Sequence, residues 1–320
     1  MSVKFANAEA FYQPHYKLLP FRFSKLDAKR YFISTDYGEW ICLTDEQLSV
    51  LVSKKEITDK KLYYELRSKH IIIDDDALDP IPLLASKYKT KKAFLENFAQ
   101  LHIFVLTVRC NNSCVYCQAS RKSCQSDSAR FDMSEAVLDG SIDMALSMPS
   151  SKLTLEFQGG ESTLTMPLVR RAVKLVQQKS TGKEIQFVLC TNLCEVNDGD
   201  LNFLIEHNIS ISTSLDGPQS LHNANRKFSQ AGAWEALIAT LDRIRQKNAF
   251  GNVSALMTTT RPSLGLHKEI IDEYIRHGFS SIFIRELNPY GFAQKYFSKI
   301  GYTTEAFWLS MKNAWTISYS

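Results

Sequence analysis

The feature that most constrains the fold is a regular alternation of apolar runs and helical patterns over residues 101–287. The apolar runs lie at 101–108, 152–158, 184–190, 209–215, 252–258 and 281–287. The helical patterns between them lie at about 134–147, 167–179, 198–207, 232–247 and 267–277. Strands separated by single helices form right-handed βαβ units and a parallel sheet. The fold class is therefore α/β, either a doubly wound sheet or an incomplete barrel.

A different pattern occupies the first 85 residues. Three short runs alternate as strands do, at 21–23, 31–34 and 39–43. Thr44, followed three residues later by Gln47, is a cap signal for a helix, and a second helical pattern leads to an apolar run at 71–73. Strands, two helices and a closing strand indicate a small α+β module, winged-helix-like in outline.

The aspartates and prolines of residues 74–82 are the best boundary signal in the chain. We therefore expect four parts. They are the small α+β module at 1–85, a bridging helix at 86–100, the strand–helix domain at 101–291 and a helical segment at 292–320.

Composition narrows the function classes. Net charge is only +4 and no block of five or more like charges occurs, so no nucleic-acid partner is expected. No apolar run reaches the roughly 18 residues that cross a bilayer, and the N-terminus lacks the apolar centre of a secretory signal. We expect no membrane association and a cytoplasmic location. Seven cysteines, an odd number in a reducing compartment, point to metal or catalysis rather than to disulfides.

Three of these cysteines, Cys110, Cys114 and Cys117, directly follow the first strand of the alternating region. Catalytic groups of parallel α/β folds gather at the carboxyl ends of the strands. A structural zinc ion or an electron-transfer [4Fe–4S] cluster normally takes four protein ligands, so three would leave one iron open to a substrate or cofactor. The alternatives are a zinc site completed by Cys124, or three unrelated buried cysteines.

The stretch from Cys110 to Cys117 resembles the CxxxCxxC signature of radical S-adenosylmethionine (radical SAM) enzymes, with Tyr116 as the aromatic residue before the last cysteine. The resemblance implies a partial (β/α)6 barrel of TIM type, a [4Fe–4S] cluster on the three cysteines and S-adenosyl-L-methionine on the open iron. It also implies reductive cleavage of S-adenosylmethionine to a 5′-deoxyadenosyl radical. Such an oxidoreductase needs an electron donor such as flavodoxin or ferredoxin.

Further segments resemble motifs of the same superfamily, in the same order. Gly159-Gly160-Glu161, after the second strand, is similar to the GGE motif that binds the amino group of S-adenosylmethionine, although such a turn occurs in many proteins. Asn192 lies in a segment similar to the family's TNG strand end, but Leu193 stands in place of the glycine, so the tight turn is in question. The implied S-adenosylmethionine-binding residues are Tyr116, Gly159, Gly160, Glu161, Asn192, Ser214 and Arg226.

Ser214 and Arg226 belong to a segment that resembles the SxDGP…H…R stretch of one branch of the family. There a hydroxyl suits a ribose and a guanidinium suits an anion such as a carboxylate. An ordinary turn before a helix is the alternative. We expect structural roles for His222 in this segment and for Cys190 and Cys194 before it.

That branch contains the anaerobic sulfatase maturases and the maturases of ribosomally made peptides, and residues 19–23 and 117–121 look most like the radical maturases of the His-Xaa-Ser peptide system. The resemblance implies a peptide or protein substrate that loses a hydrogen atom. Gln158 and Arg285 are candidate substrate contacts. In related maturases a winged-helix-like module adds the leader of the peptide as a strand; residues 15–80 either do this or only pack on the barrel.

Two other functions stay open. The same chemistry could act on a small molecule or an RNA, or the chain could be a non-catalytic peptide-binding or zinc-stabilised scaffold. Members of the branch usually continue into a cysteine-rich extension with auxiliary clusters, whereas no cysteine follows Cys194 here. The chain is therefore either truncated or without those clusters, and the catalytic group that acts after hydrogen abstraction stays unassigned.

Overall fold

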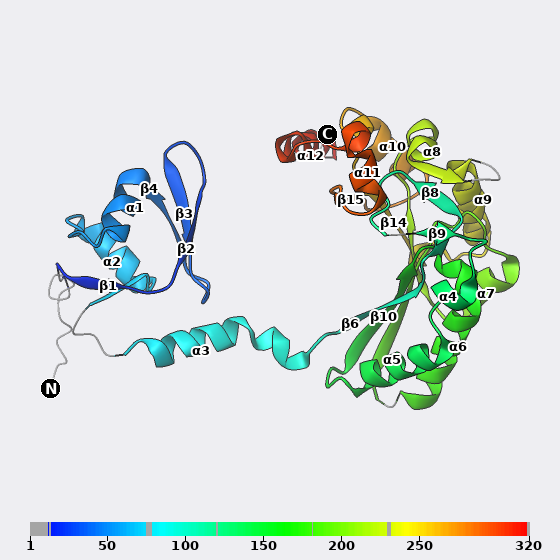
Figure 1. Ribbon diagram of the computed structural model, residues 1–320, viewed down its shortest axis with the longest axis horizontal. Helices are drawn as coiled ribbons and strands as arrows, with labels where there is room; N and C mark the ends of the chain where they lie inside the picture. The colour runs from blue at the N-terminus through cyan, green and yellow to red at the C-terminus, as the bar shows by residue number, and fades with distance from the viewer. Residues whose placement is uncertain are drawn as a thin grey trace. The chain divides into compact units, whose positions relative to one another are not determined.

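The computed structural model describes residues 12, 14–74, 79–119, 121–180, 182–228 and 232–318. It divides into two compact units, with the boundary between Glu96 and Asn97 (Figure 1). None of the helices within the described ranges has both the length and the apolar composition that crossing a membrane would take.

Unit 1 is a small α+β module. Its elements are β1 (Tyr16–Leu18), β2 (Arg22–Lys25), β3 (Arg30–Ser34), β4 (Trp40–Thr44), α1 (Asp45–Val52), α2 (Lys60–Ser68), β5 (Ile72–Asp74), α3 (Ile81–Lys91) and a 3₁₀ helix (Ala93–Asn97). Strands β2, β3 and β4 form an antiparallel sheet in that order, and β1 pairs antiparallel with β5. The sequence pattern did not indicate β1, and α3 begins five residues before the expected bridging helix.

The start of α1 shows why the sequence folds as it does in this unit. Thr44 Oγ1 accepts the backbone N–H of Gln47 at 3.2 Å, and Gln47 Oε1 accepts that of Thr44 at 3.0 Å. This reciprocal capping box satisfies two backbone donors that a helix end would otherwise leave unpaired. Ile33, Leu51 and Tyr63 then pack, fully buried, in a core of their own.

Unit 2 is built on one parallel sheet. Its strands are β6 (Leu101–Thr107), β10 (Lys152–Gly159), β11 (Glu184–Cys190), β12 (Ser210–Ser214), β14 (Val253–Thr258) and β15 (Phe283–Arg285). They lie in the order β6-β10-β11-β12-β14-β15, and every pair is parallel. A doubly wound sheet reverses its strand order at a switch point, whereas this order follows the chain throughout. The alternative left open by the sequence is thus settled in favour of a partial barrel.

The helices that connect these strands are α5 (Glu135–Ser147), α6 (Met166–Lys179), α7 (Asp198–Glu206), α9 (Ala233–Gln246) and α10 (His267–Arg276). They pack on one face of the sheet, as right-handed crossovers in sequential order require (Figure 1). Along β6, Phe104 and Leu106 point into this core, while Ile103 and Val105 face the other way and are about half exposed, at 52% and 50%. The sheet therefore has a packed outer face and an accessible inner face.

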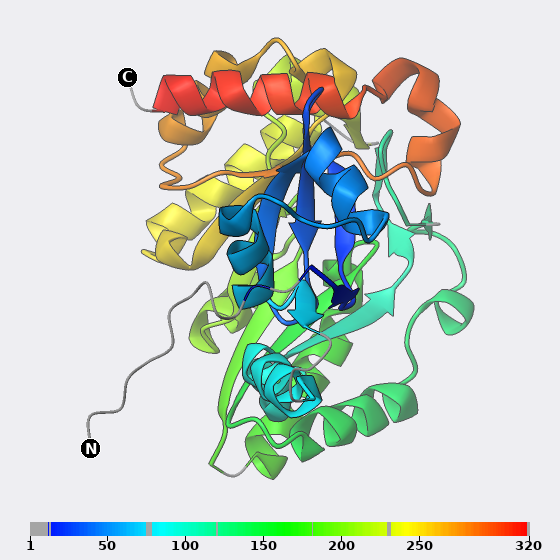
Figure 2. The same cartoon turned by 90° about the vertical axis from the view of Figure 1, so that its left-hand side faces the viewer.

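Short elements surround the carboxyl ends of the strands. They are β7 (Arg109–Cys110), β8 (Asn112–Cys114), β9 (Lys122–Ser123), α4 (Ser128–Phe131), α8 (Gln219–Asn225), β13 (Arg226–Phe228), α11 (Phe292–Ile300) and α12 (Thr304–Ser318), with 3₁₀ helices at Ser162–Thr165 and Arg261–Ser263. A further 3₁₀ helix, Phe250–Asn252, directly precedes β14 at its amino end. β7 pairs with β9, and β8 pairs with β13. α12 lies beside α10, as both ribbon views show (Figures 1 and 2).

Candidate active site

The three predicted cluster ligands lie in one loop, residues 109–118, which we call the cluster loop. Cys110 ends β7, Cys114 ends β8 and Cys117 follows, so the loop leaves the carboxyl end of β6 as expected. All three thiols are partly buried. Burial raises the pKa of Cys110 to about 12 and that of Cys114 to about 11. Because iron binds thiolates, a metal that enters this loop has to displace these protons.

Three separate segments of the chain contact the backbone of the cluster loop. A Cβ on Gly160 would lie 2.1 Å from the carbonyl oxygen of Arg109, so only glycine allows this approach. β13 pairs antiparallel with β8, which sets Arg226 opposite Cys114. At the other end of the loop, the backbone N–H of Phe292 donates to the carbonyl of Cys117 at 2.8 Å, and a Cβ on Gly291 would lie 2.6 Å from Gln118 O. These contacts therefore hold the backbone of the cluster loop at three points.

The donor set distinguishes between the two metal sites that the sequence left open. A zinc ion draws all its sulfurs to about 2.3 Å from one point. Within the described ranges, no three His, Cys, Asp or Glu side chains gather closely enough to hold one metal ion. Each cysteine of a [4Fe–4S] cluster binds a different iron, so its thiols surround a larger body. Three cysteines in one supported loop match the three-thiolate ligand set of a [4Fe–4S] cluster with one open iron, whereas a structural zinc site takes four protein ligands.

Glu161 joins the ends of two strands. Its carboxylate is buried and accepts the hydroxyl of Thr191 at 2.6 Å, the backbone N–H of Asn192 at 2.8 Å, and both the N–H and the hydroxyl of Thr163 at 3.1 and 2.8 Å. Burial raises the pKa of Glu161, and these donors oppose that effect. Gly159 lies in the same turn, where a Cβ would come within 2.1 Å of Thr107 O. In this structure the glycines and the carboxylate both hold β10 against its neighbours.

Asn192 connects β11 to the cluster loop, because its Nδ2 donates to Asn111 Oδ1 at 2.7 Å. The next residue, Leu193, has a positive φ of 56° and is fully buried. The tight turn that the sequence left in question is therefore formed without a glycine. A left-handed non-glycine residue costs about 1–2 kcal/mol, and burial of a leucine side chain contributes about 1.5–3 kcal/mol.

Asp216 is the residue that sequence reasoning missed. Its carboxylate, fully buried, accepts the hydroxyl of Tyr116 at 2.6 Å, Arg226 Nε at 3.2 Å and Asn225 Nδ2 at 3.2 Å. The Arg226 guanidinium also lies over the Tyr116 ring, 5.2 Å from its centroid. Tyr116 and Arg226, both predicted to contact S-adenosylmethionine, thus pair with Asp216. The SxDGP resemblance contained this aspartate, but a turn explained it equally well.

The remaining predicted residues lie around the same end of the sheet. Ser214 ends β12 and is half-buried opposite Leu256 of β14. Gln158 comes near the end of β10, and Arg285 ends β15. Arg285 donates to Gln118 Oε1 at 3.2 Å, which brings it to the cluster loop. His222 is buried and its Nδ1 accepts the backbone N–H of Asp216 at 3.2 Å.

Comparison with known proteins supports this assignment. The radical SAM superfamily model matches residues 104–274, more than half of the chain. An uncharacterized protein of Methanocaldococcus jannaschii is 28% identical over 58% of this chain and 62% of its own length. The cysteine-type anaerobic sulfatase-maturating enzyme of Clostridium perfringens is 29% identical over 37% of this chain and 33% of its own length. The chain thus spans less than two thirds of the length of each of these relatives.

Solved structures agree on the fold. Native anSMEcpe with bound AdoMet superimposes with a TM-score of 0.53 at 20% identity, over 59% of this chain and 51% of that one. The same enzyme with AdoMet and the Cp18Cys peptide gives a TM-score of 0.52 at 21% identity, over 58% and 50%. Coproporphyrinogen III oxidase of Escherichia coli, a radical SAM enzyme, gives 0.50 at 13% identity, over 71% and 55%.

The partial barrel and the cysteine loop at its mouth define the class of protein, an enzyme of radical SAM type. This chain belongs to the radical SAM superfamily, and it is related to the anaerobic sulfatase maturases. The family uses a [4Fe–4S] cluster and S-adenosylmethionine, so the predicted enzyme class, fold class and cofactors are confirmed.

Proposed function

We propose that this protein modifies a peptide or protein by abstracting a hydrogen atom from one of its residues. Cys110, Cys114 and Cys117 hold the cluster, and the turn from Gly159 to Glu161 takes the amino group of S-adenosylmethionine. When bound, the cluster and S-adenosylmethionine together supply a 5′-deoxyadenosyl radical. The observation that carries the proposal is the support of the three-cysteine loop by glycine contacts at the carboxyl ends of six parallel strands.

The other parts of the chain would complete this site. Asn192 holds the loop through Asn111, and Arg226 with Tyr116 keeps it against β12. We assign Ser214, at the end of β12, to the ribose. Gln158 and Arg285, on the second and sixth strands, are our candidates for contact with the substrate.

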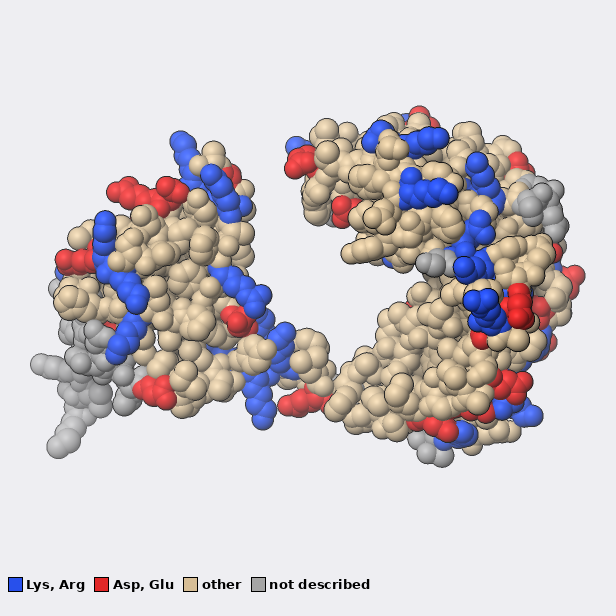
Figure 3. All heavy atoms as spheres, viewed as in Figure 1, with Lys and Arg blue, Asp and Glu red and all other residues tan. Residues whose placement is uncertain are grey.

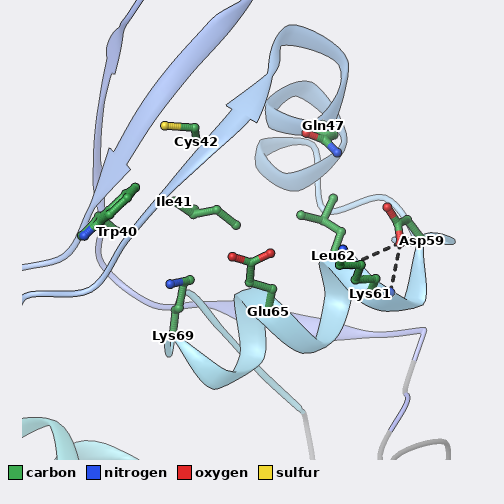
Figure 4. Close-up of a pocket in the computed structure, with 9 residues that line it drawn as sticks. All are labelled: Trp40, Ile41, Cys42, Gln47, Asp59, Lys61, Leu62, Glu65 and Lys69. Atoms are coloured by element: carbon green, nitrogen blue, oxygen red, sulfur yellow. Dashed lines mark hydrogen bonds between the residues drawn. The ribbon is translucent and has the colours of Figure 1, made fainter.

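A groove in unit 1 supports a peptide substrate. It has a volume of about 380 Å³ and lies between β4 and α2 (Figure 4). Its lining residues are Trp40, Ile41, Cys42, Gln47, Asp59, Lys61, Leu62, Glu65 and Lys69. Among the described strands β4 pairs only with β3, so its other edge has unpaired backbone groups facing the groove. An extended peptide can add to such an edge, with its side chains in the adjacent groove.

Figure 4 shows Leu62 and Glu65 pointing from α2 into the space beside β4. The groove therefore offers apolar contact and charge together, the combination that fixes the register of an added strand. One of the solved relatives, anSMEcpe, holds a peptide. We propose that the groove binds a recognition segment of the substrate, while the residue to be modified reaches the barrel of unit 2.

The cofactor part is tested by anaerobic reconstitution with iron and sulfide. We expect a brown protein with absorption near about 400 nm, as thiolate-ligated [4Fe–4S] clusters show, that forms 5′-deoxyadenosine with dithionite. Cys117→Ala should lose both properties, and Cys42→Ala, which changes a thiol in unit 1, should lose neither. A colourless protein that binds zinc would contradict the proposal.

The peptide part is tested with fluorescently labelled candidate precursors, to be sought among any short proteins encoded beside the gene. Trp40→Ala should weaken their binding by about ten-fold or more, because exposed tryptophans are frequent hot spots. Trp308→Ala is the matched control, since both indoles are exposed, at 57% and 65%, and only Trp40 lines the groove. Equal binding by wild type and Trp40→Ala would contradict a role for the groove. No peptide binding by wild type, with 5′-deoxyadenosine formation intact, would favour a small-molecule or RNA substrate.

A further inference from the structure

The inner face of the barrel carries a carboxylate that the proposed function does not use. Side chains alternate along β10, so Leu155 and Phe157 enter the core while Glu156 and Gln158 face inward and are half-buried. Glu156 lies four residues, about 13 Å of strand, before Gly160 under the cluster loop. Glu156 therefore lies inside the barrel, further from the carboxyl ends of the strands than the cluster loop. It is on the same face of β10 as the predicted substrate contact Gln158.

Among the described residues, protein donors occupy only one of the two oxygens of Glu156. Both Gln158 Nε2 and Cys190 Sγ donate to Oε1, the thiol at 3.2 Å. In the same described ranges no hydrogen bond to Oε2 is found, and none of the described cations forms an ion pair with Glu156. Two donors on one oxygen fix the plane of the carboxylate, and the second oxygen is left directed away from them.

The thiol suits this anchoring role. Burial, followed by the hydrogen bond to Glu156, raises the pKa of Cys190 to about 12. Cys190 therefore keeps its S–H at neutral pH and acts as a donor. A cysteine that binds a metal, by contrast, has to be a thiolate.

The neighbouring side chains in register with Glu156 are uncharged. In register with Glu156 lie Ile103 on β6 and Val188 on β11, both aliphatic. Val105 follows Ile103 on the inner face of β6 and is half exposed. Figure 3 shows the hollowed side of unit 2 lined mostly by uncharged residues. A carboxylate attracts a cationic group by its charge, and aliphatic neighbours give the carbon atoms of that group an apolar contact.

We propose that Glu156, anchored by Gln158 and Cys190, is the recognition site for a cationic group of the substrate, an ammonium, guanidinium or imidazolium. Ile103 and Val105 pack on the aliphatic or aromatic part of the same side chain. That the cationic group belongs to a residue of a peptide rests on the proposed function. That Glu156 binds a cationic group does not rest on it. Within this role Glu156 determines which residue is presented to the mouth of the barrel.

The site is tested on the anaerobic holoenzyme with two small probes of nearly the same shape, N-butylguanidinium, which is charged, and N-butylurea, which is neutral. Saturation-transfer NMR titrations give their dissociation constants, so the measurement does not depend on turnover. We expect wild type to bind the cation at least about ten-fold more tightly, as a charge-assisted hydrogen bond implies. Glu156→Gln should remove the preference, and Glu206→Gln, an exposed carboxylate on α7, should retain it.

Two results would overturn the proposal. One is equal binding of the two probes by wild type, and the other is an unchanged preference in Glu156→Gln. If Glu156→Gln does not fold, Glu156→Asp, which withdraws the same charge by one methylene, should reduce the preference but not abolish it.

The second source of a cation is S-adenosylmethionine itself. Saturating S-adenosylmethionine should leave the preference for butylguanidinium in place. Its loss, together with weaker S-adenosylmethionine binding by Glu156→Gln, would assign Glu156 to the cofactor and overturn a substrate site. Neither probe contacts a peptide, so a negative result here leaves the groove of unit 1 untouched, and failure of peptide binding in that groove leaves this site untouched.

Discussion

The hydroxyl of Tyr116 donates to Asp216 Oδ2 at 2.6 Å, which ties the cluster loop to the end of β12. Tyr116 lies between two of the three cysteines, so this bond acts directly on the spacing of the thiols. The same carboxylate binds Arg226, whose backbone pairs with Cys114 through β13. All three side chains are at least nine-tenths buried. One carboxylate therefore holds the cluster loop through both a side chain and a strand.

Asp216→Asn should destabilise unit 2 and reduce cluster incorporation. The substitution leaves the Arg226 guanidinium buried without its counter-charge, and breaking a buried pair from one side typically costs about 3–5 kcal/mol. Urea unfolding should show this loss of free energy of unfolding, and iron analysis after reconstitution should show less than the wild-type content.

An exposed ion pair serves as the control. Asp198 binds Arg243 at 2.7 Å, and the Asp198 side chain is 74% exposed. Asp198→Asn should leave the free energy of unfolding close to that of wild type, because exposed ion pairs contribute little. If both aspartate variants lose the same free energy of unfolding, the buried network is not what supports the loop.

Much of this arrangement follows from local sequence. The predicted bounds of the six strands and the five connecting helices lie within two residues of the observed bounds. Their apolar periodicity is long and uninterrupted, which makes such elements easy to predict. The cluster loop was found from Cys110 and its strand. Asp216 was not, because its partner Tyr116 is 100 residues away in sequence, and polar pairing between distant segments leaves no periodic signal.

Glycine contacts were invisible for a related reason. The missing Cβ of Gly160 makes room for Arg109 O, a contact that the sequence around Gly160 did not indicate. Nothing in a glycine residue indicates which neighbour approaches it. The neighbour of Gly160 depends on the register between β6 and β10. That register cannot be seen in the sequence of either strand alone.

Gly160→Ala should displace the cluster loop. The new Cβ would lie 2.1 Å from a backbone oxygen, so either the strand end or the loop has to move. We expect a loss of iron binding together with a lower free energy of unfolding, since overpacking typically costs about 1–3 kcal/mol. Iron content and urea unfolding measure the two effects.

The matched change is Gly140→Ala. Gly140 lies inside α5 and has nothing within 4 Å of its would-be Cβ. Alanine there should stabilise the helix by about 0.5–1 kcal/mol and leave iron content unchanged. Normal iron content in Gly160→Ala would show that the loop does not depend on this close approach.

His222 should make the stability of unit 2 pH-dependent. Burial lowers its pKa to about 4, whereas an unfolded histidine titrates near about 6.5. The unfolded chain therefore binds the extra proton first as pH falls. The contribution of His222 is fully present above about pH 6.5 and is lost between there and about pH 4, by up to about 3 kcal/mol.

His222→Gln keeps a hydrogen-bond acceptor for the Asp216 backbone but does not titrate. Urea unfolding from pH 7.5 to 4 should show a smaller fall in stability for His222→Gln than for wild type, with the difference developing below about pH 6.5. Parallel curves for the two proteins would mean that His222 binds its proton equally well in the folded and the unfolded chain.

Leu193→Gly tests whether the turn after β11 needs its leucine. Glycine relieves the left-handed backbone, a gain of about 1–2 kcal/mol, but it removes a fully buried side chain, and burial losses of this kind cost about 2–5 kcal/mol. Because the loss of packing exceeds the relief of the backbone, we expect net destabilisation of roughly 1–3 kcal/mol by urea unfolding. Asn248→Gly isolates the effect of the backbone, because Asn248 has a similar φ of 55° and an exposed side chain; it should be neutral or slightly stabilising. A stabilised Leu193→Gly would show that backbone strain, and not packing, dominates at this turn.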